Sequence, residues 1–286
     1  MLPAGAPRGS GGWGDELVRR VADRESQIVL GLDPDPGRLW PIAGEGASGA
    51  RVLAHCRGVI DAAGPACVAV KPQLACFERL GGPGWEALRG VVDHARAAGL
   101  LVIADGKRGD VPVTAAVYAE ALVTGLGADA FTANPLLGVD ALAPLVASGA
   151  GVFVLVRTSN PGARDIQDLE LAEGGALWER LARIVAELGR PGAGGLADVG
   201  AVVGATEPWH LERARELMPH AVFLLPGVGA QGGRVEDLAP AFGPGRAGGL
   251  VSASRSIVGA HESDGGEPAA SARAAAERLR ELTWSL

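Results

Sequence analysis

Short, nearly continuous apolar segments alternate along the chain with longer segments whose apolar residues recur at helical spacing. Continuous apolar runs of this length are typical of strands that are buried on both faces, as in a parallel sheet. The predicted strands are 27–33, 68–71, 100–105, 129–134, 151–157, 201–206, 222–226 and 249–254. The predicted amphipathic helices include 85–98, 176–187, 209–217 and a closing helix at 271–282. Eight β-then-α units predict a single-domain α/β fold, a (β/α)8 TIM barrel, with an open doubly wound sheet as the alternative.

Four segments fall outside this alternation of predicted strands and helices. Residues 1–14 are rich in glycine and predict a flexible N-terminal tail, which leaves 15–286 for the barrel and its closing helix. Long loops are expected at 159–175 and 189–200, and loops of this length in a compact domain are often functional. The first is placed to fold over a pocket as a lid, whereas the second has no assignable role. Residues 261–270 are polar and are expected to be loosely ordered.

Composition narrows the classes of function. The 286 residues carry a formal net charge of −7, which argues against broad nucleic-acid binding. The three cysteines are too few, and odd in number, for a disulfide framework, which favours a reducing cytoplasm. No apolar run reaches the roughly 18 residues that a membrane span needs. We therefore expect a cytoplasmic protein that has neither nucleic acid nor a membrane as a partner.

Polar residues stand at the ends of nearly all predicted strands. Asp33, Lys71 and Asp105 each end a strand, and Lys107 follows two residues later. The other ends carry Asn134, 157–160, Thr206, 226–233 and 252–255. In a barrel these ends meet at one rim, where barrel enzymes place their sites. Strand ends can be polar simply because they meet water, and we prefer that interpretation for Thr206 alone. Two acids and two bases in one cavity are costly unless they pair or act, which favours a site.

The charged residues suggest a chemistry. Asp105 and Lys107 share a face of an extended segment, and Lys71 comes from the neighbouring strand. Paired carboxylates can bind Mg²⁺, but Lys107 stands where the cation would go. An ammonium flanked by carboxylates can instead deliver a proton to a carbanion as a general acid. A surface salt-bridge network is the alternative, although the apolar run at 99–104 leads directly into the cluster.

A second group of residues suits a phosphate. The closely spaced glycines of 226–233 allow the backbone to approach an anion, and Gln231 lies among them. Arg255 follows the next strand, and an arginine can hold a phosphate through two hydrogen bonds. The glycines alone would predict an ordinary tight turn. Together with Arg255 they favour phosphate, because barrel enzymes often bind it after strands seven and eight.

The segment from Asp105 to Asp110 resembles the Asp-x-Lys-x-x-Asp motif of the orotidine 5′-phosphate decarboxylase family. Further similar segments follow in order at 70–73, 134–138, 157–161, 203–206, 226–233 and 254–255, and they are similar to the longer bacterial branch called type 2. The resemblance implies a homodimeric barrel that converts orotidine 5′-monophosphate to UMP and CO₂ in de novo pyrimidine biosynthesis, without a cofactor or a metal.

The resemblance also implies a role for each matching residue. Lys107 is expected to protonate C6 of the substrate, Asp105 to face its carboxylate, and Lys71 to complete the charge network. Asp110 is expected to reach into the partner subunit's site, with Thr114 near it. The implied substrate contacts are Asp33 for ribose, Ser159 for the pyrimidine, and Gln231 and Arg255 for phosphate.

The sequence departs from the family pattern at Gly106, where alanine is commoner, at 111–114, and at Leu136, where tyrosine is frequent. Two alternatives stay open. A related barrel enzyme could act on a sugar phosphate through a metal-bound enediolate, and a non-catalytic barrel could only bind a nucleotide.

Overall fold

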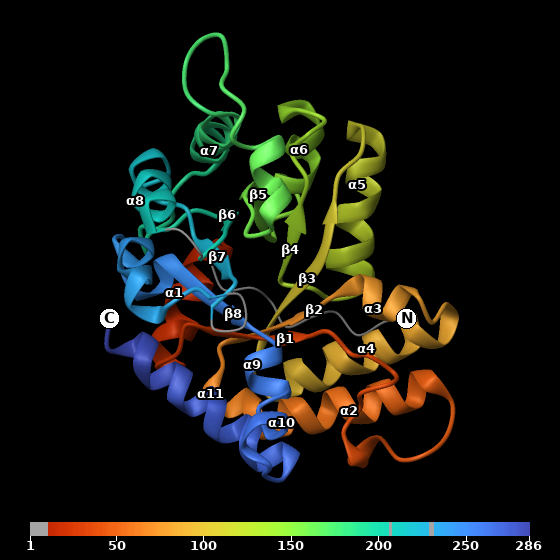
Figure 1. The fold of residues 1–286 in the computed structure, drawn as a ribbon. Coiled ribbons are helices and arrows are strands. Elements are labelled where there is room, and N and C mark those ends of the chain that lie inside the picture. Colours follow the sequence, from red (N-terminus) through yellow and green to blue (C-terminus); the bar gives the residue numbers. More distant parts are fainter. Residues whose placement is uncertain (1–10, 206–207, 229–231) are drawn as a thin grey trace.

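The computed structural model describes residues 11–205, 208–228 and 232–286. Within these ranges eight parallel strands close into a barrel, in the order in which they occur in the chain (Figure 1). They are β1 (Ile28–Leu32), β2 (Ala69–Pro72), β3 (Leu101–Arg108), β4 (Ala130–Ala133), β5 (Gly151–Arg157), β6 (Val199–Val203), β7 (Phe223–Pro226) and β8 (Gly249–Ala253). Pairing of β1 with β8 confirms the predicted barrel, because an open doubly wound sheet would leave two unpaired edges.

Helices surround the barrel. The described α-helices are α1 (Trp13–Arg24), α2 (Ser48–Ala63), α3 (Leu74–Glu78), α4 (Gly82–Ala97), α5 (Pro112–Glu120), α6 (Val139–Val146), α7 (Leu177–Leu188), α8 (Pro208–Leu217), α9 (Arg255–Val258), α10 (His261–Asp264) and α11 (Pro268–Trp284). The four amphipathic segments predicted from spacing are α4, α7, α8 and α11. Proline begins α5, α8 and α11, where its missing N–H and fixed φ suit a helix start.

The prediction of a loose segment at 261–270 is wrong. Helix α10 begins at His261, and α11 begins at Pro268. The Glu267 side chain accepts the N–H of Ala270 and caps α11. The hydroxyl of Ser271 donates to Asp264 at 2.8 Å and joins the two helices. Local capping therefore orders a polar segment that has little hydrophobic patterning.

Strand side chains alternate between the barrel interior and the layer under the helices. On β3, Leu101 and Ile103 belong to the interior cluster, whereas Val102 and Ala104 pack towards the helices. The next residue in the interior phase is Asp105. The apolar filling of the barrel therefore ends, at the carboxyl end of the strands, in a charged side chain.

Helix α1 closes the opposite end of the barrel. Trp13 contributes to the interior cluster and meets Phe153 edge to face, with ring centroids 5.3 Å apart. A Cβ on Gly151 would lie 2.4 Å from the Trp13 ring, so only glycine fits beneath it. The expected tail 1–14 therefore ends earlier than predicted, since Trp13 and Gly14 are already in α1. Residues 1–10 of that tail lie outside the described part of the chain.

The second long loop holds α1 in place. Asp198, at its end, accepts the N–H of Gly14 at 2.7 Å, and Gly194 donates its N–H to Asp15 at 2.7 Å. The loop at 189–198, for which the sequence suggested no role, thus anchors the N-terminus of α1. Cys56, Cys67 and Cys76 are all free thiols, as the cysteine count predicted. Among the described residues, we find no helix with the length and apolar character needed to cross a membrane.

Candidate active site

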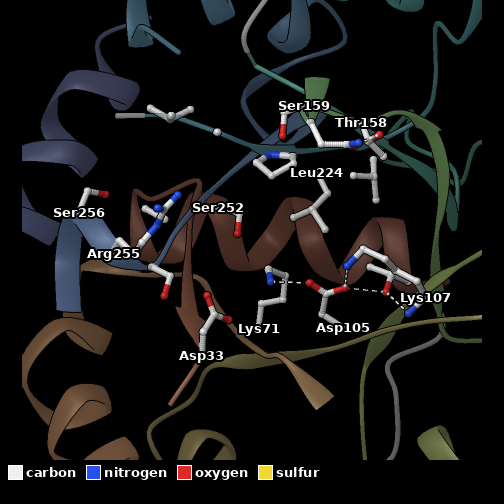
Figure 2. A pocket seen from close by; sticks show the side chains of 18 residues that line it. Asp33, Lys71, Asp105, Lys107, Thr158, Ser159, Leu224, Ser252, Arg255 and Ser256 are labelled. Carbon is white, nitrogen blue, oxygen red and sulfur yellow. Dashed lines mark hydrogen bonds and ion pairs between the residues drawn. The ribbon is translucent and has the colours of Figure 1, made fainter. Parts of the chain in front are cut away.

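A cavity of about 310 Å³ opens at the carboxyl ends of the strands (Figure 2). Of the nine residues that the sequence assigned to a site, six line it: Asp33, Lys71, Asp105, Lys107, Ser159 and Arg255. Asp110 and Thr114 are not among the described residues that line it. Gln231 and Thr206 lie outside the described part of the chain. The fold therefore gathers these six residues around one pocket, and their roles stay predictions.

Asp105 is the centre of the charged cluster in this pocket. Its Oδ2 lies 2.6 Å from Nζ of Lys71, and its Oδ1 lies 2.6 Å from Nζ of Lys107 (Figure 2). Asp105 and Lys71 are only 5% and 8% exposed. Burial raises the pKa of Asp105, but the charges of Lys71 and Lys107 outweigh burial and lower that pKa to about 2. The carboxylate is therefore ionised at neutral pH.

Lys71 remains charged although it is buried. Burial alone would lower its pKa, yet the facing carboxylates of Asp105 and Asp33 hold that pKa above its usual value. Of the 26 basic residues in the chain only Lys71 and Lys107 are lysines, and all the others are arginines. Lysine has a compact ammonium that can release a proton, which a guanidinium cannot do. The rarity of lysine therefore marks these two positions independently of the motif that contains Lys107.

A bulge in β3 displaces the charged residues from the ladder with β4. Ala104 pairs with Phe131, and the next pair is Arg108 with Ala133, so 105–107 face the single β4 residue Thr132. Bulges often re-aim side chains next to active sites. Lys107 adopts φ 47°, which is uncommon for a residue other than glycine. A Cβ on Gly106 would lie 2.7 Å from Cδ1 of the buried Leu74, so the departure from alanine fits the local packing.

Two polar clamps fix the base of the loop at 159–175. The Arg157 guanidinium forms two hydrogen bonds with the Asp168 carboxylate, at 2.8 and 2.9 Å. The Gln167 side chain accepts the N–H of Thr158 at 2.8 Å and donates to its hydroxyl at 3.0 Å. Ser159, the next residue, lines the pocket. The segment that could move as a lid is thus shorter than the sequence suggested, and its closure stays a prediction.

Arg255 lies across the pocket from the charged cluster (Figure 2). It begins α9 directly after β8, and Pro226 and Gly227 at the end of β7 line the same cavity. The indole N–H of Trp40 donates to the carbonyl of Val258 at 3.1 Å and holds the other end of α9. The arginine and the β7 turn therefore meet at the place that was predicted for phosphate.

Asp110 and Thr114 lie beside an exposed apolar surface, on the continuation of β3 and in α5. Val113 is 81% exposed and Leu136 is 76% exposed. We call the surface formed by Val111, Val113, Val117, Leu136, Leu137 and Val139 the α5–α6 patch. Helices α5 and α6 are neighbours, so these side chains belong to one face of the molecule. A patch of this kind in a water-exposed position is typical of an interaction surface.

The sequence interpretation overlooked Thr132. Its hydroxyl donates to Asp105 Oδ1 and accepts the N–H of Lys107, both at 2.9 Å. The available signal was its spacing: Thr132 stands two residues before Asn134, in the interior phase of an otherwise apolar strand. Gln167 and Asp168 were overlooked as well, because they lie in a loop without periodicity. Among the described residues no three His, Cys, Asp or Glu side chains are grouped to hold a metal ion.

A closed barrel whose strand ends gather a Lys–Asp–Lys cluster and an arginine around one pocket defines a TIM-barrel enzyme. The model of the Orotidine 5′-phosphate decarboxylase / HUMPS family matches residues 26–274, and the chain belongs to that family. It is 44% identical to the orotidine 5′-phosphate decarboxylase of Deinococcus radiodurans over 273 residues, which cover 93% of this chain and 94% of the relative. It is 45% identical to that of Haloarcula marismortui over 251 residues, 87% of each chain.

A solved structure, that of Leishmania donovani OMP decarboxylase, has a TM-score of 0.77 and 31% identity with this chain. The match covers 96% of this chain and 98% of the chain in that structure. The family expected from the motifs is thereby confirmed, whereas assignment to the type 2 branch stays a prediction.

Proposed function

We propose that this protein decarboxylates orotidine 5′-monophosphate to UMP and CO₂, as the carboxy-lyase of de novo pyrimidine biosynthesis. The observation that carries the proposal is the Lys71–Asp105–Lys107 cluster at the rim of the barrel. Relatives named for this activity are similar to the chain over nearly its whole length. The restriction of lysine to these two positions adds support, since the reaction needs a cation that can give up a proton.

In the proposed reaction the bond between C6 and the carboxylate breaks and leaves its electron pair on C6. Nζ of Lys107 donates a proton to that carbon, and the resulting neutral amine regains a proton from water. The ionised Asp105 faces the substrate carboxylate, and this repulsion disappears as CO₂ departs. The two ammonium groups stabilise the negative charge that develops on the ring. The proposed reaction uses no cofactor and no metal.

The rest of the pocket is proposed to orient the nucleotide. Arg255 and Gln231 hold the phosphate, and Asp33 and Lys71 contact the ribose. Ser159 reads the pyrimidine from the end of β5. The arginine and the cluster lie on opposite sides of the pocket, as suits a ligand with an anionic group at one end and a reacting ring at the other (Figure 2).

We further propose a cytoplasmic homodimer of the type 2 branch, in which Asp110 and Thr114 complete the partner's site. The α5–α6 patch supports the dimer because it is apolar, exposed and adjacent to both residues. Burying such a patch between two copies would remove its contact with water. Sedimentation at micromolar concentration tests this proposal, and a monomer would contradict it.

The activity is tested with purified protein by the loss of absorbance as orotidine 5′-monophosphate is consumed, in the presence of EDTA. Turnover under chelation supports the proposal. Turnover of a sugar phosphate that requires Mg²⁺ would favour the metal-dependent alternative, and UMP binding without turnover would favour a binding protein. The sharpest variant is Lys107→Arg, which keeps a positive charge beside Asp105 but removes the proton donor. We expect it to lose turnover, and wild-type activity would refute the role of Lys107.

A further inference from the structure

Thr132 occupies the β4 position that faces the three-residue bulge of β3. The directions of its two hydrogen bonds follow from chemistry. The carboxylate of Asp105 is ionised and can only accept, so the Thr132 hydroxyl donates to it. The backbone N–H of Lys107 can only donate, so the same oxygen accepts it. One hydroxyl therefore binds the two residues to which the proposed function assigns the chemistry.

These bonds hold the bulged segment against β4. The bulge brings the Lys107 N–H to the side chain of Thr132, whose hydroxyl oxygen accepts it. Thr132 is only 1% exposed, so water cannot readily substitute for its hydroxyl. Lys107 is also held at φ 47°, a conformation that a non-glycine residue keeps only when its surroundings impose it. The Thr132 hydroxyl is the side-chain acceptor that supplies this constraint.

We propose that Thr132 is a positioning residue, whose hydroxyl fixes both the carboxylate plane of Asp105 and the backbone of Lys107. It aims the Lys107 ammonium at the reacting carbon without touching the reacting atoms. This inference rests on the proposed function for its effect on catalysis. The hydrogen-bond geometry can be tested separately from catalysis.

The key variant is Thr132→Val, which keeps the shape of the side chain and removes the hydroxyl. The matched control is Thr283→Val, because Thr283 is equally buried but its hydroxyl bonds only to carbonyls of its own helix α11. We expect Thr132→Val to lower kcat roughly 10- to 100-fold, as loss of a hydrogen bond to a charged group does. The Kd for UMP should stay within about threefold of wild type, since the proposed role of Thr132 is to position the charged cluster and not to bind the ligand. Thr132→Ser should restore most of kcat, and Thr283→Val should leave it unchanged.

The second readout needs no substrate. Labelling with [¹⁵N]lysine gives two backbone amide signals, because the chain has two lysines. In Thr132→Val the Lys107 amide should exchange with D₂O at least roughly tenfold faster, having lost its acceptor. The Lys71 amide, within β2, serves as the internal control and should not change. If Thr132→Val does not fold, Thr132→Ala carries the same two measurements.

The possible outcomes distinguish the positioning role of Thr132 from the proposed decarboxylase function on which it rests. An unchanged Lys107 amide, or a kcat within about twofold of wild type, overturns the role of Thr132. A fall in kcat that Thr132→Ser does not restore overturns it too, since the hydroxyl would then not be the cause. A wild-type protein that does not consume orotidine 5′-monophosphate refutes the proposed function instead, and the amide exchange still decides the positioning.

Discussion

Replacing Asp105 with asparagine is expected to destabilise the fold as well as to abolish turnover. Asparagine has nearly the same shape and can still accept the hydrogen bond of Thr132. What is lost is the negative charge at 2.6 Å from both ammonium groups. The Lys107 side chain is 41% exposed and can recover its hydration, whereas that of Lys71 is 10% exposed and cannot. The loss of folding stability therefore comes from the buried ammonium of Lys71.

The size of the effect follows from the burial of Lys71. Removing the partner of a buried charge costs roughly 3–5 kcal/mol. Asp33 still faces Lys71 and retains part of the attraction, so we expect about 3 kcal/mol. At roughly 2–4 °C per kcal/mol for a large domain, Tm should fall by about 6–12 °C.

The effect has a defined pH dependence. Because the pKa of Asp105 is lowered in the fold to about 2, from 3.8, its stabilising contribution is fully present above about pH 4. That contribution is lost as the pH falls from 4 towards 2. The difference in stability between wild type and Asp105→Asn should therefore be constant from pH 7 to 5 and shrink below pH 4.

Urea unfolding, followed by tryptophan fluorescence at several pH values, measures this difference. Asp93→Asn on the exposed face of α4 removes a carboxylate without a buried partner and is the matched control. The double variant Asp105→Asn/Lys71→Met should regain most of the lost stability, because no buried charge is left unpaired. A single variant as stable as wild type, or a double variant no more stable than the single one, would refute this reasoning.

Three further changes test other parts of the molecule. Asp168→Asn weakens the clamp with Arg157 at the base of the Ser159 loop and should raise KM roughly tenfold, with a smaller effect on kcat, in steady-state assays. Val113→Asp places a charge on the most exposed residue of the α5–α6 patch and should yield an inactive monomer in sedimentation and activity measurements. Trp13→Ala removes the ring that meets Phe153 and should lower the free energy of unfolding by about 3–5 kcal/mol, measured in urea, with activity retained at low temperature.

Each of these has a result that would contradict it. An unchanged KM in Asp168→Asn would mean that the clamp does not position the loop. A dimeric, fully active Val113→Asp protein would remove the α5–α6 patch as the interface. A Trp13→Ala protein with wild-type stability would show that α1 is not needed to close the barrel.

Much of the architecture could be predicted because burial on both faces leaves a plain signal. Each of the eight predicted strands overlaps an observed one, since each strand is buried on the face in the barrel interior and on the face under the helices, and so must be apolar on both. The rim residues could be predicted for the same reason. A charged residue such as Asp105 or Lys71 interrupts an apolar run only where the barrel interior ends.

What could not be predicted depends on contacts between distant segments. Trp13 looked like part of a glycine-rich tail, because its partner Phe153 is far away in sequence. Thr132 looked like an ordinary strand residue, because the bulge that gives its hydroxyl two partners is on another strand. The order of 261–270 came from capping side chains, which leave no periodic pattern.

The bulge divides β3 into two parts that differ in their pairing with the neighbouring strands. Residues 101–104 pair in register with the neighbouring strands and so belong to the scaffold, whereas 105–107 have left the ladder with β4, although Asp105 still bridges to Gln73 beside β2. A change of side chain within 105–107 would therefore alter the charged cluster without shifting the register of the other seven strands. The register of the barrel and its reactive groups are thus set by different parts of one strand. Protein engineers could vary 105–107 to search for new chemistry, provided that the buried Lys71 keeps a compensating partner.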